Sequence, residues 1–273
     1  MKVDLLDLAA QRHARGEPFA LATVVRTVSV TAAKAGAKAL IAQDGSISAG
    51  WIGGGCARAA VLKAARQSML DGRSRLVSIQ PRDLLAQQGF EPGEDRGGTL
   101  YANNACPSQG TMDVFVEPVL PRPTLLILGA SPIAVALADL APRMDFAVIV
   151  AAAKDDLGKF ADVAHRREGF DVSAIDARHA FVVVSTQGAG DRAALKAAAA
   201  LDADYTAFVG SRRKAATLRD ELAREGVSRA RLDAIKAPAG LDIHAITTEE
   251  IALSIMAEII AARRARQQAH GGS

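Results

Sequence analysis

Apolar residues recur along the first part of the chain with two periods, one typical of helices and one typical of strands. The pattern predicts, in chain order, a helix at 3–15, a strand at 19–29, a hairpin at 36–51, a helix at 56–71, a strand at 74–79 and a strand at 111–118. The hairpin is expected to turn at Asp44 and Gly45, and Gly72 is expected to end the second helix. The glycine-rich segment 87–98 is interpreted as a loop.

Three prolines, Pro118, Pro121 and Pro123, form the densest proline cluster in the chain. Because proline cannot donate a backbone hydrogen bond, we place a domain boundary here, with one domain at 1–120 and a second at 121–273. In the second domain short apolar strands alternate with helical patterns, and the strands are expected at 125–128, 147–150, 181–185 and 206–209. The fold class is therefore α/β, a small N-terminal α/β domain followed by a Rossmann-like parallel-sheet domain.

Composition narrows the class of protein. Hydrophobic residues make up 49% of the chain and aromatic residues only 4%, so the core must be built from Ala, Val, Leu and Ile. A net charge of +3 is too small to indicate nucleic-acid binding, and the apolar runs are too short to cross a bilayer. Two cysteines give no disulfide framework, and the N-terminus does not resemble a signal peptide. We expect a soluble, cytoplasmic protein without stable membrane insertion; a homodimer is compatible with the sequence.

Three consecutive glycines, Gly53, Gly54 and Gly55, stand directly before Cys56 and the second predicted helix. Glycine lets the backbone approach a ligand closely, and the free N–H groups at a helix start favour anions and thiolates. Cys56 therefore stands where a thiolate would be stabilised. The alternative is a tight turn in which Cys56 packs as a small hydrophobic residue.

The second cysteine, Cys106, lies in the polar turn YANNACPSQG before a predicted strand. If its loop converges with that of Cys56, the two thiols form a site for a soft metal or a thiol-seeking cofactor. Their 50-residue spacing matches no zinc pattern, so no metal ligands are assigned. Two thiols in polar loops favour ligand binding over inert packing.

The first strand of the second domain leads into a partial dinucleotide-binding fingerprint. Gly129 occupies the first glycine position, Ser131 the second and Ala134 the third. Ser131 crowds the approach of a pyrophosphate, and Asp155 comes too late to bind a ribose. Residues 185–187 (Ser-Thr-Gln) follow a strand, at the usual ligand edge of such sheets. We therefore expect a Rossmann-like fold but not tight binding of NAD(P).

Ser211 also follows a predicted strand and is expected to be the N-cap of a helix. Arg212, Arg213 and Lys214 add positive charge to the positive end of the helix dipole, which costs stability unless an anion is present. A phosphate or a pterin pyrophosphate would explain the cluster, and so would salt bridges to carboxylates elsewhere. The candidate cofactor-binding residues of the second domain are Gly129, Ser131, Ser211, Arg212 and Arg213.

Near the C-terminus, Thr247 and Glu250 have the spacing of a capping box. Ile251, Ile255 and Ile259 form an apolar stripe, which predicts a helix that packs against the core. No Ser–His–Asp spacing, metal-ligand cluster or general acid–base pair emerges from the sequence, so no catalytic or metal-binding residue is assigned.

Several of these stretches together resemble the XdhC/CoxI family, the accessory proteins of molybdenum hydroxylases such as xanthine dehydrogenase and carbon monoxide dehydrogenase. The resemblance covers most of the chain and rests on GAKALIAQDGSISAGWIGGGC, Cys106 followed by TMDVFVEP, VGSRRKAATLRDEL and APAGLDIHAITTEEIALSIMAEI. Family members commonly have Gly-Gly after the second cysteine and an acid two residues after the first. This chain has Pro107, Ser108 and Arg58 there and resembles a divergent branch.

The resemblance implies a protein that binds the molybdenum cofactor (molybdopterin) transiently, supports its sulfuration by a cysteine desulfurase and hands it to an apo molybdenum hydroxylase. It implies Cys56 and Cys106 as the cofactor contacts, with Gly53 to Gly55 shaping the approach. The leading hypothesis is thus a cofactor chaperone rather than an enzyme. The alternatives are an NAD(P)-dependent oxidoreductase that uses the Rossmann-like domain and an assembly scaffold that binds no ligand.

Overall fold

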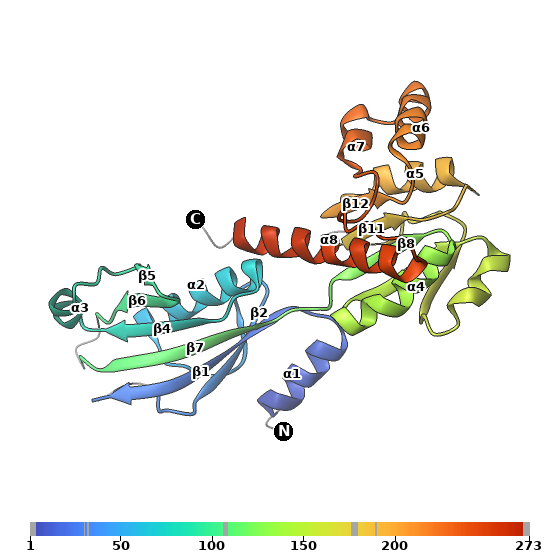
Figure 1. Cartoon of the computed structure of the whole chain (residues 1–273). Helices are drawn as coiled ribbons and strands as arrows, with labels where there is room; N and C mark the ends of the chain where they lie inside the picture. Colours follow the sequence, from blue (N-terminus) through green and yellow to red (C-terminus); the bar gives the residue numbers. More distant parts are fainter. Residues whose placement is uncertain are drawn as a thin grey trace. The chain divides into compact units, whose positions relative to one another are not determined.

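A computed structural model describes residues 4–29, 31, 33–105, 109–175, 180–188 and 190–269. The chain divides into two units, and the division lies in the proline cluster, between Pro121 and Arg122 (Figure 1). The first unit runs to Pro121 and includes the end of the last helix from Arg266, whereas the second unit spans 122–265. Each unit contains its own sheet and its own hydrophobic core.

The first unit is built on a seven-stranded sheet with the strand order β3-β2-β1-β7-β4-β6-β5. Neighbouring strands are antiparallel except for β4 and β6, which run parallel. Its elements are α1 (Leu5–Ala14), β1 (Phe19–Val28), β2 (Lys38–Ala42), β3 (Ile47–Gly50), α2 (Gly55–Asp71), β4 (Arg75–Gln80), α3 (Arg82–Gln88), β5 (Asp95–Arg96), β6 (Thr99–Asn103) and β7 (Thr111–Val119).

Local sequence signals account for most of these elements. The hairpin of β2 and β3 turns at Asp44 and Gly45, and Gly72 ends α2 in the left-handed conformation, as predicted. The prediction of a loop at 87–98 is wrong in part, because this segment contains the end of α3 and the two-residue strand β5. Neither α3 nor β6 is predicted. Both are short, so neither shows a full hydrophobic period.

Helix α2 covers one face of this sheet. Val61 and Ala65 of the helix share a buried cluster with Val77 and Ile79 of β4. Because side chains alternate along a strand, Ser78 and Gln80 lie on the opposite face. Only residues 72–74 join α2 to β4, so the helix runs back along the strand on which it packs (Figure 1). The start of α2 therefore lies at the carboxyl end of β4.

The second unit has a five-stranded, fully parallel sheet with the order β10-β9-β8-β11-β12, which confirms the Rossmann-like prediction. Its elements are β8 (Thr124–Leu128), α4 (Pro132–Leu140), the 3-10 helix η1 (Ala141–Met144), β9 (Ala147–Ala152), the 3-10 helix η2 (Lys154–Phe160), β10 (His165–Glu168), β11 (Ala180–Val184), α5 (Asp191–Ala200), β12 (Tyr205–Phe208), α6 (Arg212–Arg224), α7 (Arg229–Ala234) and α8 (Thr248–Ala269). The edge strand β10 escapes sequence analysis because all four of its residues are exposed.

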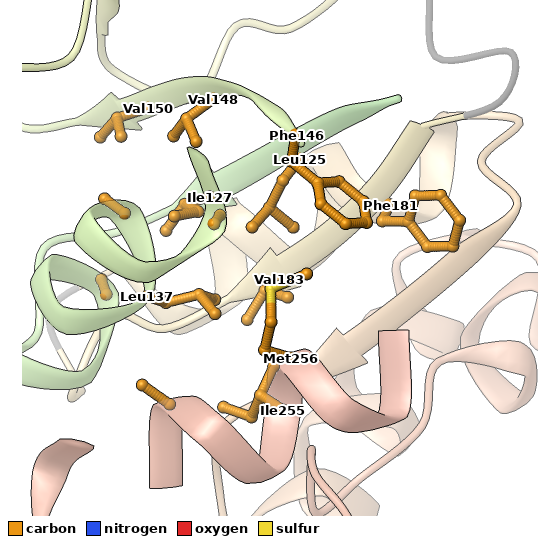
Figure 2. Close-up of a cluster of buried hydrophobic side chains, with 14 of the residues drawn as sticks. Leu125, Ile127, Leu137, Phe146, Val148, Val150, Phe181, Val183, Ile255 and Met256 are labelled. Carbon is orange, nitrogen blue, oxygen red and sulfur yellow. The ribbon is translucent and has the colours of Figure 1, made fainter. Parts of the chain in front are cut away.

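Helices cover both faces of this parallel sheet. Alternate residues of the central strands enter two separate buried clusters, one with α4 and α8 and the other with α5, α6 and α7. Figure 2 shows Leu137 of α4 and Met256 of α8 packed against the first of these faces. Phe146 and Phe181 meet edge to face there, with ring centroids 5.6 Å apart. In the part of the chain that the structure describes, no helix combines the length and apolarity needed to span a membrane.

Candidate functional site

The turn after β8 lies tightly against the end of β11. Gly129 has a φ of +118°, and a Cβ at this position would lie 2.4 Å from the Ser185 carbonyl oxygen. Its N–H donates to the Ala151 carbonyl at 2.9 Å. Glycine is therefore required here by the protein's own backbone, whether or not a nucleotide is bound.

Ser131 is the N-cap of α4, and its hydroxyl is engaged with protein groups. Its Oγ accepts from the Ala134 N–H at 3.1 Å and lies 2.6 Å from the Ser185 Oγ. Its own N–H donates to the Ser185 carbonyl at 3.1 Å. Both serines are buried. The position of the second fingerprint glycine is thus part of a packed strand–helix junction, and weak NAD(P) binding stays a prediction, to be measured by NADH titration.

A buried carboxylate, Asp191, stands beside this junction at the first residue of α5. It accepts hydrogen bonds from the Thr186 hydroxyl and from the Gly188 N–H at 3.3 Å, and it pairs with the Lys214 ammonium. For Lys214, the salt-bridge explanation of the basic cluster is therefore the one observed.

Helix α6 begins after Ser211, as predicted, and the two arginines of the basic cluster lie in its first turn. Ser211 is the N-cap of α6 and accepts from the Lys214 N–H at 3.2 Å. Arg212 and Arg213 are exposed, and within the described ranges neither has an ion-pair partner. An anion site at these two arginines stays a prediction.

Removal of the Lys214 charge should make the second unit less stable in a pH-dependent way. Burial alone raises the pKa of Asp191, but hydrogen bonds from Lys214 and Thr186 outweigh it and lower the pKa overall. A lowered native pKa stabilises the fold above the unfolded value, about 3.9, and this contribution is lost as the pH falls through the native pKa. Lys214→Met should therefore cost about 1 kcal/mol at pH 7, and the difference from wild type should narrow below about pH 4. Urea unfolding at several pH values measures it; a difference independent of pH would contradict the assignment.

The glycines before Cys56 form an open helix start in the first unit. Gly53 and Gly55 have positive φ values of 109° and 52°, and Gly54 is the extended N-cap of α2 with no side-chain cap. A Cβ at Gly54 or Gly55 would meet no described heavy atom within 4 Å. Helix α2 begins at Gly55, one residue earlier than predicted, so Cys56 is its second residue.

The connection that carries the second thiol begins at the same end of the sheet. The Asn104 N–H donates to the Gln80 carbonyl at 2.6 Å, and its side-chain amide donates to the Gly110 carbonyl at 2.6 Å. Cys106 lies between these two residues in the sequence and outside the described residues. The carboxyl end of β4 thus lies next to both the start of α2 and the flanks of the 104–110 connection. That the two thiols meet stays a prediction.

Sequence analysis missed a buried polar line on the sheet face opposite α2. Asp113 accepts from the Arg26 Nε and from the Ser78 hydroxyl, both at 2.7 Å, and Ser78 accepts from the Gln80 amide at 2.8 Å. Polar residues at alternate positions of an otherwise apolar strand, SRLVSIQ, were the available signal. Among the described residues, no three His, Cys, Asp or Glu side chains gather as metal ligands.

Comparison with known proteins gives the family. The model of the XdhC and CoxI family matches residues 12–80, and the model of the XdhC Rossmann domain matches residues 125–259. The chain belongs to the XdhC and CoxI family. Membership confirms the resemblance to this family.

One curated protein and one solved structure are similar to this XdhC/CoxI chain. YqeB of Escherichia coli K12, described as an uncharacterized protein, is 29% identical over 97% of this chain, and the chain spans 46% of that relative's length. A crystal structure described as a xanthine dehydrogenase from Bacillus halodurans has a TM-score of 0.62 at 19% identity, over 98% of this chain and 70% of that chain. This second likeness shows the fold.

Proposed function

We propose that this chain binds the molybdenum cofactor (molybdopterin) as cargo, supports its sulfuration by a cysteine desulfurase, and passes it to an apo hydroxylase of the xanthine dehydrogenase type. The observation that carries the proposal is the open start of α2, with Gly54 and Gly55 unobstructed and Cys56 in the first turn. The role is that of a carrier rather than of a catalyst.

The chemistry of this helix start supports the proposal. Free backbone N–H groups and the helix dipole favour the phosphate of the cofactor, and they stabilise a thiolate in the first turn. A thiolate is a soft ligand suited to a molybdenum–sulfur group, and Cys106 is its candidate partner. Buried acceptor oxygens at the end of the same sheet, on Gln80 and Asn103, fit a cargo that donates hydrogen bonds.

Anaerobic ultrafiltration with cofactor released from a molybdenum enzyme tests the thiols. Wild type should retain the cofactor, and the Cys56→Ala, Cys106→Ala double variant should lose most of it. Absence of retention by wild type, or equal retention by the double variant, would overturn the proposed role of the thiols.

A second variant separates steric access from thiol chemistry. Gly54→Ala keeps an ordinary backbone, since φ is −110°, and clashes with no described atom, but it places a methyl group in front of the helix start. We expect at least tenfold weaker retention with an unchanged melting temperature. Gly158→Ala, another glycine with open space around its Cβ position, is the matched control and should bind normally. Normal binding by Gly54→Ala would place the cargo elsewhere.

A further inference from the structure

The hydrogen-bond donors and acceptors of the buried polar line follow a fixed order. Asp113 pairs with Arg26, and an ionised carboxylate can only accept hydrogen bonds. The Ser78 hydroxyl must therefore donate its proton to Asp113, at 2.7 Å. Its oxygen is then left to accept, and the Gln80 side chain must present its NH₂ group to it, at 2.8 Å. The arginine thus sets the orientation of the Gln80 amide through two intervening side chains.

As a consequence, the side-chain oxygen of Gln80 is left in a buried position without a hydrogen-bond donor from the residues that the structure describes. With its NH₂ group held by Ser78, Gln80 must turn its Oε1 away from the line. That oxygen is buried and has no hydrogen-bond partner among the described residues, and Gln80 is only 5% exposed. A buried acceptor without a donor costs free energy, so a molecule that supplies a donor is favoured here.

A second unpartnered acceptor stands next to the first. Asn103 of β6 is the register partner of Gln80 in the parallel pair, so the two side chains lie on the same face of the sheet. The Asn103 Oδ1 is also buried and has no partner in the described part of the chain. Both residues end their strands: Asn103 directly precedes the connection that carries Cys106, and the Gln80 carbonyl accepts from the Asn104 N–H of that connection at 2.6 Å. Two neutral acceptors side by side match a ligand edge that carries adjacent N–H donors.

We propose that Gln80 and Asn103 recognise the amino-pyrimidine edge of the cofactor's pterin, accepting from its amino group and ring N–H. This inference rests on the proposed function and assigns specificity for the pterin part of the cargo. The two acceptors lie at the same end of the sheet as the start of α2, on the face opposite that helix. Arg26, Asp113 and Ser78 act as positioning residues, because they hold the Gln80 amide with its oxygen toward the ligand. A ligand that presents oxygen at the same edge would face two acceptors and be disfavoured.

Competition against retained cofactor tests the recognition. 6-Methylpterin and 6-methyllumazine differ by an oxygen in place of the 2-amino group. From wild type, the pterin should displace the cofactor at about tenfold lower concentration than the lumazine, and in Gln80→Met this preference should disappear. Because Gln80→Met also removes an unpartnered buried oxygen, its melting temperature should not fall. Gln87→Met, on the exposed face of α3, is the matched control and should keep the preference.

The outcomes separate this inference from the function on which it rests. An unchanged preference in Gln80→Met with a lowered melting temperature would make Gln80 purely structural and overturn the inference alone. Asn103→Leu, which lies outside the Asp113 line, should also lose the preference, and keeps the test decisive if Gln80→Met fails to fold. Wild type that retains no cofactor would overturn the proposed function and this inference together.

Discussion

A Gly129→Ala variant should lose roughly 3–5 kcal/mol of unfolding free energy in the second unit. The new Cβ would lie 2.4 Å from the Ser185 carbonyl oxygen, 2.6 Å from its carbonyl carbon and 2.8 Å from the Thr186 Cα. All three are backbone atoms, so no side-chain rotation relieves the clash. The φ of +118° adds strain for any residue with a side chain. Urea unfolding followed by circular dichroism measures the loss.

The matched control separates the clash from the backbone conformation. Gly188 also has a positive φ, +101°, but a Cβ there meets nothing within 4 Å. Gly188→Ala should therefore cost only about 1 kcal/mol, the conformational part of the penalty. Equal losses in the two variants would show that the close approach of β8 and β11 does not set the requirement for glycine at position 129.

The same junction contains features that sequence analysis could predict and one that it could not. Gly129 and Ser131 were identified from a short local fingerprint, and the capping box is confirmed, with Thr247 accepting from the Glu250 N–H at 3.2 Å. Such signals span only a few residues, and the hydrogen bonds that they predict form between residues close together in the chain. The contact of Ser131 with Ser185 joins residues 54 positions apart, and no local pattern encodes it.

In the candidate site of the first unit, too, one part could be predicted from the sequence and another part could not. The glycines before Cys56 were visible in the sequence as three consecutive residues, and positive φ values favour glycine at two of them, Gly53 and Gly55. The acceptor pair was not, because Gln80 acquires its orientation from Asp113, which lies on a strand that is distant in the chain. Burial and register decide whether an amide is an ordinary polar residue or a recognition group, and both come from the tertiary fold.

Loss of one charge from the buried ion pair Asp71–Arg75 should have the largest effect in the first unit. The Asp71 side chain is fully buried and that of Arg75 is 9% exposed. Arg75 also donates to the Ser68 hydroxyl at 3.2 Å and to the Arg73 carbonyl at 3.1 Å. Burial alone raises the pKa of Asp71, and the hydrogen bond from Arg75 lowers it overall. Arg75→Met should therefore cost about 3–5 kcal/mol at pH 7, because it leaves a buried carboxylate without its cation.

The double variant Asp71→Leu, Arg75→Met should recover much of that loss. A buried ion pair gains little over apolar side chains of similar size, since desolvation of both charges offsets their attraction, whereas one unpaired charge carries the full penalty. The double variant should thus be more stable than Arg75→Met alone at neutral pH. The gap between these two variants should shrink in acid, because protonation of Asp71 removes the unpaired charge in the single variant. Chemical unfolding of wild type, the two single variants and the double variant at pH 7 and pH 4 gives the coupling energy between the two residues. If the double variant loses as much stability as the two single variants added together, the two residues stabilise the end of α2 independently.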